Sequence, residues 1–386
     1  MNRKIVIFTM SPRQSQFEVD RLETEAGKMG IEVNRALYRE LSFDLNPSRP
    51  LAASPFDPPS PSASDGRGRG ENNRIKARVF VRGEELTVEN TMGLWFRVAG
   101  TKSGKYTEAR NLAIRILRGG NEGRMENNTE RRKWDSARTV FCVNEKGYLG
   151  WTRMGKIAQH GVFLENNIPI VPTKIFYTRE QILNPLGLRP APLDPTTAMQ
   201  SDGQSEERLE REMFFDWEYP IIAKHERGYQ GKSVRKFENR KEMEDFVNKI
   251  DEKNLGMFLW QKYLPTRWDI RVVIVDGKAI GGMKRSAVGD EFRSNFSLGG
   301  AVETWNLSEE EKNLAEKVAK VCGLDYGGVD IMKNPKSQNL NSKEYREEDY
   351  DNYILEVNRQ CQFQGFEKAT GINVAKYIVE MIIKRS

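Results

Sequence analysis

Hydrophobic and polar residues follow two different periods along the chain, and these periods predict strands and helices in alternation. The apolar stretches Lys4–Met10 and Ile31–Leu37 predict two strands, and Gln14–Met29 between them has the spacing of an amphipathic helix. Ala77–Val81 and Glu85–Val88 flank a glycine-containing turn and predict a hairpin. The first part of the chain is therefore predicted to be an α/β domain.

The centre of the chain continues this mixture. A helix is predicted over Trp151–Asn167 and a strand directly after it, over Ile168–Thr173. A further strand, Tyr219–Lys224, leads into a glycine-containing loop. Arg240–Ile250 has apolar residues at positions i, i+3, i+4 and i+7, which predicts a helix with one buried face.

The last third is the most regular part of the pattern. Asp276 and Gly277 between two apolar stretches are a strong signal for a two-residue hairpin turn. Ser308 and Glu311 form a capping box at the start of a helix that Gly323 ends. The predicted elements are strands over Phe258–Leu264, Asp269–Val275, Lys278–Ala287, Gly328–Met332 and Tyr353–Asn358 and helices over Ser308–Cys322 and Val374–Lys384.

Three segments lack the apolar residues that packing requires. Asn46–Asn73 is rich in Pro, Ser, Gly and Arg and is predicted to be a disordered insertion. Asn184–Glu212 is first rich in Pro and then acidic, which is typical of an insertion or linker. Lys333–Asp351 is a polar excursion between two predicted strands.

Composition narrows the class of protein. With 386 residues, 38% of them hydrophobic, the chain is long enough for two or three domains. No apolar run approaches the roughly 18–20 residues of a membrane span, and the N-terminus lacks a signal-peptide cleavage site. The three cysteines are widely spaced and indicate neither a disulfide framework nor a zinc motif. These features predict a cytoplasmic protein with no membrane partner.

Charge and histidine content restrict the chemistry. The net charge is +6, and the 61 basic and 55 acidic residues are well mixed, which weakly favours anionic ligands. No basic-aromatic array indicates specific binding of nucleic acid. Because the chain has only two histidines, its chemistry is expected to come from Lys, Arg, Asp, Glu and Asn.

Side chains with oxygen atoms interrupt two of the C-terminal strands. Glu356 and Asn358 are two residues apart, so they are expected to share one strand face with Ile354. Asp330 interrupts another apolar strand. If the two strands pair, the three oxygen-bearing side chains converge, and magnesium prefers such hard ligands. The alternative is a solvated polar face, which is common in antiparallel sheets.

Cationic residues suit phosphate or carboxylate groups at three places. Lys224 ends a strand before glycines that allow backbone N–H groups to approach phosphates. Asp269 alternates with Arg271, and Arg293 alternates with Asn295, a spacing that suits the clamping of anionic oxygens. The alternative at each place is an exposed surface with salt bridges.

Five motifs in a fixed order make these interpretations more specific. They are Trp268-Asp-Ile-Arg-Val, Gly289-Asp-Glu-Phe-Arg-Ser-Asn-Phe-Ser-Leu-Gly-Gly, Gly328-Val-Asp-Ile, Leu355-Glu-Val-Asn and Gly365-Phe-Glu-Lys-Ala-Thr-Gly-Ile-Asn. Together they resemble the ATP-grasp superfamily and, within it, the RimK-type carboxylate–amine ligases such as the ribosomal-protein glutamate ligases. The resemblance extends from about Trp151 to Ile383.

The resemblance implies roles for the candidate residues. Lys156 and Lys224 resemble the two lysines that hold the α- and β-phosphates of ATP, and Gly228, Gly231 and Ser233 the loop that closes over them. The nucleotide contacts at the interdomain hinge, where backbone groups bind adenine, would be Gln261, Lys262, Tyr263 and Leu264, with Asp269 nearby. The implied catalytic residues are Arg271, Arg293 and Asn295, and the implied metal ligands are Asp330, Glu356 and Asn358.

The resemblance also implies a fold of three domains, α/β and α+β. Residues 1–148 would form an α/β N-terminal domain with a disordered insertion at 46–73. Residues 149–260 would form a small central lid domain with an insertion at 184–212. Residues 261–386 would form a C-terminal antiparallel-sheet domain that carries the metal site.

The implied reaction joins a carboxylate to an amine through an acylphosphate. Its cofactors would be ATP and Mg2+, with two ions expected and Mn2+ as an alternative. The expected substrates are an amino acid such as glutamate and the carboxylate of a protein or peptide, and a homo-oligomer is compatible with this activity. Two other hypotheses stay open, a small-metabolite ligase of the same fold and a non-catalytic ATP-binding regulator. The intact set of candidate residues argues against the regulator.

Two departures from the family pattern concern the site. Arg359–Phe363 stands where the family has a turn of small residues, which leaves the acceptor substrate open. Lys262 replaces a glutamate, a change that a backbone contact to adenine tolerates. Cys361 is expected to be a packing residue, because the implied chemistry needs no thiol.

Overall fold

The protein is described by a computed structural model that covers residues 3–46, 76–97, 105–119, 140–151, 155–183, 218–226, 228, 234–288, 301–335 and 350–386. These residues form two compact units, Met1–Glu145 with Ala375–Ser386 and Lys146–Val374. The three domain boundaries expected from the family stay predictions. The insertions at 47–73 and 184–212, and residues 336–349 of the polar excursion, lie outside the described residues.

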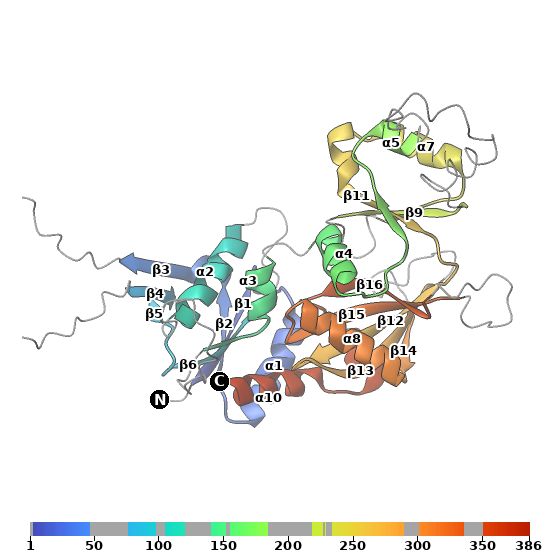
Figure 1. The fold of residues 1–386 in the computed structure, drawn as a ribbon. Helices are drawn as coiled ribbons and strands as arrows, with labels where there is room; N and C mark the ends of the chain where they lie inside the picture. Colours follow the sequence, from blue (N-terminus) through green and yellow to red (C-terminus); the bar gives the residue numbers. More distant parts are fainter. Residues whose placement is uncertain are drawn as a thin grey trace, which may run out of the picture. The chain divides into compact units, whose positions relative to one another are not determined.

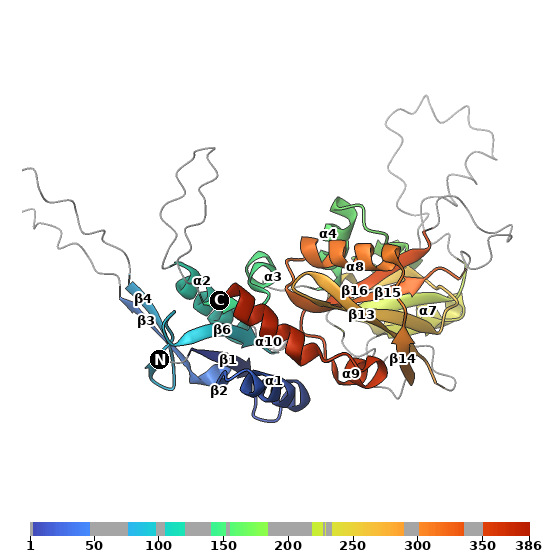
Figure 2. The same ribbon diagram turned by 90° about the horizontal axis from the view of Figure 1, so that it is seen from below.

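The first unit is built on a parallel sheet with the strand order β2-β1-β6-β7 (Figure 1). Its elements are β1 (Lys4–Thr9), α1 (Gln16–Lys28), β2 (Val33–Leu37), β6 (Thr91–Phe96), α2 (Lys105–Gly119), β7 (Phe141–Cys142) and the C-terminal helix α10 (Val374–Arg385). Gly93 lies in β6 where a Cβ atom would be 2.6 Å from Ile382, so α10 packs directly against the strand (Figure 2). The predicted α/β character of this region is confirmed.

A second, antiparallel sheet in this unit has the order β3-β4-β5. It consists of β3 (Leu41–Asn46), β4 (Lys76–Val81) and β5 (Glu84–Glu85), and a short 3-10 helix over Tyr38–Glu40 precedes it. The predicted hairpin is present, and Arg82 and Gly83 form its turn with φ angles of 52° and 83°. The strand β3 has no counterpart in the pattern-based prediction.

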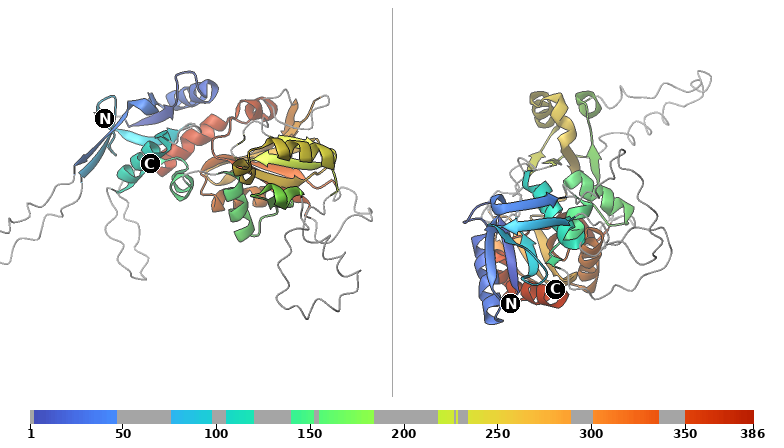
Figure 3. Two further views of the ribbon diagram at one scale, coloured as in Figure 1. Left: turned by 90° about the horizontal axis from the view of Figure 1, so that it is seen from above. Right: turned by 90° about the vertical axis from the view of Figure 1, so that its left-hand side faces the viewer.

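The second unit contains two antiparallel sheets, which we call the small sheet and the large sheet. The small sheet has the order β10-β9-β11-β8. Its strands are β8 (Thr173–Ile175), β9 (Ile221–His225), β10 (Val234–Phe237) and β11 (Phe258–Lys262). The helices α5 (Arg179–Leu183) and α7 (Arg240–Lys249) cover one face through a core that includes Trp260 and Phe237, as Figure 3 shows for α7.

The large sheet has the order β14-β13-β12-β15-β16. Its strands are β12 (Trp268–Val275), β13 (Lys278–Ser286), β14 (Ala301–Trp305), β15 (Tyr326–Lys333) and β16 (Asn352–Asn358). Helix α8 (Glu309–Val321) covers one face, and its predicted capping box is formed by Ser308 and Glu311. The turn between β12 and β13 uses Asp276 and Gly277 at positive φ, as predicted.

Helix α4 (Lys156–Glu165) contacts both sheets. The Gln159 side chain accepts a hydrogen bond from Val357 N at 2.8 Å and donates one to Val357 O at 3.2 Å. On its other side, His160 contacts Gln261 of the small sheet. Further helices are α3 (Glu145–Gly150), α9 (Gln364–Thr370) and a 3-10 helix over Glu252–Met257.

Two predictions for this unit were wrong in detail. The strand expected over Ile168–Thr173 begins later, as β8 at Thr173. Before it, Ile170 forms an isolated bridge with Ile354. Ile354 does not share a face with Glu356, because the pairing of β15 with β16 shifts by one residue at Leu355. This bulge turns Ile354 and Val357 together into the core under α8, and it leaves Glu356 on the opposite face.

Among the described residues, no helix combines the length and the apolar character needed to cross a membrane.

Candidate active site

The large sheet carries a row of charged side chains on the face opposite α8. Arg271 lies directly across from Asp330, and Asp269 lies across from Arg285. The neighbours of these residues along the strands, such as Ile270 and Val329, point into the core under α8 instead. The alternation of charged and apolar positions on β12 and β15 thus separates a polar face from a core face.

These four residues form what we call the buried charge network. The Arg271 guanidinium donates two hydrogen bonds to Asp330, with Nε–Oδ1 at 2.8 Å and Nη2–Oδ2 at 2.7 Å. Arg285 bridges both acids, with Nε 2.6 Å from Asp269 Oδ1 and Nη2 2.9 Å from Asp330 Oδ2. Bidentate pairing of this kind fixes planar groups in one orientation.

Electrostatics keeps this network charged. Burial by itself would raise the pKa of Asp330, but Arg271 and Arg285 beside it lower that pKa to about 2. Burial likewise opposes the charge of Arg271, and the adjacent Asp330 carboxylate raises the pKa of the guanidinium above its usual value. Asp330 is therefore a carboxylate at all physiological pH values, as a metal ligand must be.

Glu356 continues the row on the next strand. It pairs directly with Asp330 across β15 and β16, and Asn358 pairs with Gly328. Asn358 Oδ1 accepts a hydrogen bond from Gln360 N at 3.0 Å, which orients its amide oxygen. Unlike Asp330, the Glu356 side chain is 35% exposed. Asp330, Glu356 and Asn358, predicted from the sequence to converge, thus lie on neighbouring positions of one sheet face.

Two lysines from different elements reach this acidic edge, and with Glu356 they form what we call the lysine corner. Lys156 is the first residue of α4, and its Nζ lies 2.6 Å from Gly228 O and 3.4 Å from Glu356 Oε2. Lys224 lies on β9, on the face of the small sheet opposite the Trp260 core. Burial lowers the pKa of Lys224 to about 8, Glu356 partly offsets this, and nearby Lys156 lowers it further.

The N-terminus of α4 is held by a residue that the sequence pattern did not single out. Glu226 follows β9 and accepts a hydrogen bond from Ile157 N at 2.8 Å through its Oε2. Gly155 leaves room for this contact, since a Cβ atom there would be 1.7 Å from Glu226 Oε1. The position of Lys156 is thus set by α4 and by the first residues after β9.

The four predicted hinge residues lie at the end of β11 and directly after it. Gln261 is buried and lies across from Thr173 and Ile222. Lys262 is exposed, and its backbone N donates to Pro172 O at 3.1 Å. The Tyr263 ring lies under Lys236 Nζ at 4.4 Å from its centroid, and Leu264 is partly buried. The four predicted hinge residues are therefore contiguous, but only Gln261 projects a buried polar side chain.

The departure at Arg359 has a structural explanation. Arg359 Nη1 donates to Gly147 O at 3.0 Å and to Trp151 O at 2.9 Å, and its guanidinium stacks on Tyr148. Cys361 is buried, with its Sγ 3.2 Å from Tyr326 Oη. These residues hold the segment that leads to α4, so the unusual turn supports the chain that carries Lys156.

Several predicted site residues cannot be placed. Gly231, Ser233, Arg293 and Asn295 lie outside the described residues. Arg285, His160 and Glu226 are described contacts of the site that the prediction missed. Arg285 faces Asp269 only because the register of β12 and β13 shifts between Val273 and Ile274, and His160 and Glu226 follow no recognisable motif.

The donor set fits a magnesium ion. Within the described part of the chain, no three His, Cys, Asp or Glu side chains gather as a metal cluster. Asp330 and Glu356 contribute two carboxylates, and Asn358 an amide oxygen, on adjacent positions of β15 and β16. A set of few hard oxygens suits magnesium, which takes its remaining ligands from phosphates and water.

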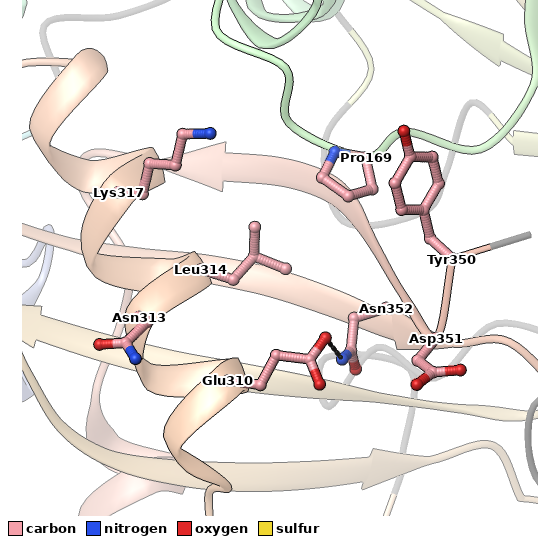
Figure 4. A pocket seen from close by; sticks show the side chains of 8 residues that line it. All are labelled: Pro169, Glu310, Asn313, Leu314, Lys317, Tyr350, Asp351 and Asn352. Atoms are coloured by element: carbon pink, nitrogen blue, oxygen red, sulfur yellow. Dashed lines mark hydrogen bonds between the residues drawn. The ribbon is translucent and has the colours of Figure 1, made fainter. Parts of the chain in front are cut away.

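A described cavity lies elsewhere, on the side of the large sheet that α8 covers. It has a volume of about 530 Å³ and is lined by Pro169, Glu310, Asn313, Leu314, Lys317, Tyr350, Asp351 and Asn352. Figure 4 shows the Glu310 side chain beside Asn352, whose Nδ2 donates to it at 3.1 Å. None of the candidate site residues lines this cavity.

Known proteins share both sequence and fold with this chain. Residues 191–382 match the model of the RimK-like ATP-grasp domain. A probable alpha-L-glutamate ligase of Shewanella pealeana is 32% identical over 168 residues, which are 43% of this chain and 33% of that protein. A tetrahydromethanopterin:alpha-L-glutamate ligase of Methanosarcina acetivorans is 36% identical over 170 residues, 40% of this chain and 52% of that protein. The chain thus spans between a third and about half of these curated relatives.

The fold has solved counterparts. The structure of the ATP-grasp ligase PsnB complexed with minimal precursor superposes with a TM-score of 0.59 and 16% identity, and the match covers 100% of both chains. A second PsnB structure, complexed with minimal precursor, Mg and ADP, gives a TM-score of 0.58 at 14% identity over 100% of this chain and 98% of that one. These matches confirm the predicted ATP-grasp fold. Residues 191–382 therefore match a RimK-like ATP-grasp domain, and the chain has the fold of ATP-grasp ligases.

Proposed function

We propose that this protein is an ATP-dependent carboxylate–amine ligase that forms an amide bond through an acylphosphate. The observation that carries the proposal is the lysine corner beside the buried charge network. Lys156 and Lys224 bring two cations to the edge where Glu356, Asp330 and Asn358 bring hard oxygens. A site with paired cations and a small oxygen set suits a nucleotide triphosphate bound with a divalent metal.

The residues of the chain have distinct tasks in this proposal. Lys156 and Lys224 would neutralise phosphate oxygens, and the low pKa of Lys224 would rise as a phosphate replaces the lost hydration. Asp330, Glu356 and Asn358 would hold Mg2+, which supplies charge neutralisation on the phosphates when bound. Arg271, with Arg293 and Asn295, would face the transferring group, and Arg271 already holds Asp330 in one orientation.

The proposed ligase reaction has two steps and needs no dedicated base. A carboxylate oxygen of the substrate attacks the terminal phosphorus of ATP, and the bond from that phosphorus to the ADP oxygen breaks. The amine of the second substrate then attacks the acyl carbon, phosphate leaves with the bonding electron pair, and the amine loses a proton to phosphate or water. Placement and charge neutralisation are the main contributions that a protein makes to such a transfer.

The substrates follow from the relatives and the fold, as proposals. Two relatives are named as glutamate ligases, so glutamate is the amine we propose first. PsnB was also solved with a precursor peptide, which supports a peptide or protein carboxylate as the acceptor. A small-metabolite ligase remains the second candidate, because the relative from Methanosarcina acetivorans is named for tetrahydromethanopterin.

An ADP-release assay tests the proposal. Purified protein would be incubated with ATP, Mg2+ and glutamate, together with peptides that end in a free carboxylate or with small carboxylic acids. We expect ADP to form only when a carboxylate acceptor is present. ATP binding without ADP formation for any acceptor would favour the non-catalytic regulator and contradict the ligase.

A further inference from the structure

A single glutamine ties helix α4 to the edge of the large sheet. Gln159 is 5% exposed, and its side chain contacts both backbone groups of Val357, with Val357 N 2.8 Å from Oε1 and Val357 O 3.2 Å from Nε2. Among the described strands, β16 is at one edge of the large sheet. The Gln159 amide therefore supplies the donor and the acceptor that the backbone of a further strand would supply.

Both partners of this contact lie next to proposed functional residues. Val357 stands between Glu356 and Asn358, two of the proposed metal ligands. Gln159 follows Lys156 by three positions, so both side chains lie on the same side of α4. On that side, Lys156 Nζ lies 3.4 Å from Glu356 Oε2. The proposed phosphate-binding lysine and the proposed metal ligands are thus connected through the contact of Gln159 with Val357.

Apolar packing holds α4 near the large sheet but does not fix its position along β16. Phe163 is buried in the core that also contains Ile354 and Val357. Hydrophobic contact has no preferred direction, so it permits a small displacement of the helix along the strand. Pro169 O accepts a hydrogen bond from Ile354 N at 2.8 Å, but Pro169 lies beyond the end of α4. Hydrogen bonds weaken steeply as their geometry departs from the optimum, so the two bonds of Gln159 set the register of the helix.

We propose that Gln159 is a positioning residue that fixes the separation between Lys156 and the metal-binding strand β16, and that it thereby couples the binding of ATP to the binding of Mg2+. The inference rests on the proposed function, which assigns a phosphate to Lys156 and a metal ligand to Glu356. Magnesium that takes ligands from both the protein and the phosphates needs both sets at a fixed separation. Without Gln159, α4 can move along β16, and Lys156 no longer holds the phosphates where the oxygens of β16 can share a metal with them.

Calorimetric titration of the full chain with ATP tests the proposal without any carboxylate or amine substrate. One titration contains Mg2+ and the other contains EDTA, and we expect the wild-type protein to bind ATP more tightly with Mg2+. Gln159→Met keeps the length of the side chain and removes both hydrogen bonds. We expect it to lower the ratio of the two affinities about tenfold, or about 1.4 kcal/mol. The loss should lie mainly in the titration with Mg2+, because only there must the phosphates and the oxygens of β16 share a metal.

Gln181→Met is the matched control. Gln181 Oε1 accepts hydrogen bonds from the backbone N–H groups of Tyr177 and Thr178 at 2.7 and 3.1 Å, so the same exchange again removes two hydrogen bonds to the backbone. Gln181 lies on α5, and these two bonds involve no candidate site residue. We expect the affinity ratio to stay at its wild-type value. An equal fall in the ratio for both variants would contradict a specific role of Gln159.

A double-mutant cycle separates positioning from general destabilisation. If Gln159 acts through Lys156, Gln159→Met should cost little further ATP affinity in a protein that already carries Lys156→Met. Losses of affinity that multiply in the double variant would show that the two side chains act independently, which contradicts the proposal. Gln159→Asn serves in the same experiments if Gln159→Met fails to fold, because it draws the amide back by one methylene group and cannot keep both bonds to Val357.

The outcomes distinguish this inference from the proposed function. If Gln159→Met retains the wild-type affinity ratio, Gln159 does not couple the two sites and the ligase proposal is unaffected. If the wild-type protein binds no ATP, or binds it equally with Mg2+ and with EDTA, the proposed function fails and this inference fails with it.

Discussion

The buried charge network and the lysine corner lie beside each other, but they differ in how completely their charges are paired. In the network, each carboxylate of Asp269 and Asp330 is bound by a guanidinium, and the charges satisfy one another. In the lysine corner, the Lys224 side chain makes no hydrogen bond or ion pair with any described residue, and burial lowers its pKa to about 8. Lys156 is held by a loop carbonyl and by the half-exposed Glu356.

The difference separates architecture from ligand binding. A charge that is paired inside the protein mainly holds neighbouring strands in one geometry, although the Asp330 carboxylate keeps a lone pair for the proposed metal beside its three contacts with Arg271 and Arg285. A buried charge with too few partners destabilises the free protein, and an ion of opposite sign stabilises the protein when it binds there. We therefore expect substitutions in the network to affect folding first, and substitutions in the corner to affect nucleotide binding and turnover first.

The largest effect on stability is expected for Asp330→Ala. Its removal leaves the guanidinium groups of Arg271 and Arg285 buried with too few partners, which should destabilise the fold by about 3–5 kcal/mol in urea unfolding. Asp245→Ala is the control, because Asp245 pairs with Lys241 on the exposed surface of α7 and its loss should change the stability little. Equal losses for both variants would remove the distinction between the two regions.

Glu356→Gln should reduce activity strongly and stability only slightly, the reverse of what we expect for Asp330→Ala. The exchange keeps the shape and one oxygen but removes a charge that faces Lys156 and the proposed metal. We expect carboxylate-dependent ADP formation to fall about 100-fold or more, while the melting temperature changes little. A variant that unfolds early instead would place Glu356 in the structural network.

Lys224→Met should stabilise the protein while it weakens nucleotide binding. The folded-state pKa of Lys224 is about 8, below its usual value of 10.5, so the folded chain loses this proton before the unfolded chain does. The loss of folding stability that comes from burying the charged Lys224 is therefore fully present below pH 8, and it is relieved as the pH rises from about 8 to 10.5.

Urea unfolding at two pH values measures this effect. At pH about 7 we expect Lys224→Met to exceed the wild-type stability by up to about 3 kcal/mol, and at pH about 10 the gain should shrink. A gain that is the same at both pH values would show that packing, and not charge, is responsible.

The smallest effect concerns the cap of α4. Gly155→Ala places a Cβ atom against Glu226 and should break its hydrogen bond to Ile157, with a loss of about 1 kcal/mol. Gly161→Ala lies in the same helix with nothing within 4 Å of the added atom, so it should stabilise the protein by about 0.5–1 kcal/mol. Thermal melting of the two variants should move in opposite directions.

Local pattern determined much of the fold. The helix cap at Ser308 and the hairpin turn at Asp276 and Gly277 depend on a few adjacent residues, and each was predicted and is confirmed. The alternation of Asp269 with Arg271 likewise placed both side chains on one strand face. Such features are decided within one turn or one pleat, so the sequence alone suffices.

Pairing between distant strands was decided only in the tertiary structure. Counting back from the turn at Asp276 places Lys284 opposite Asp269, but the register shifts at Ile280, and Arg285 takes that position. The shift at Leu355 similarly separates Glu356 from Ile354. Both bulges depend on how the strands pack against their neighbours. At Gly281, beside the bulge at Ile280, an added Cβ atom would lie 2.7 Å from Ile372.

The candidate residues themselves could thus be named from sequence, whereas the state of each charge could not. Nothing in the order of residues indicates that Asp330 is held by two guanidinium groups while Lys224 has no such partner. The same holds for Gln261, whose buried Oε1 has no hydrogen-bond partner among the described residues, while the neighbouring Thr173 and His160 side chains bond to backbone carbonyls. Sequence by itself determined the candidate groups on single strands, such as Asp330, Glu356 and Lys224, and only the packing of α4 and the two sheets decided which of these charges are paired, because hydrogen bonding and burial depend on neighbours far away along the chain.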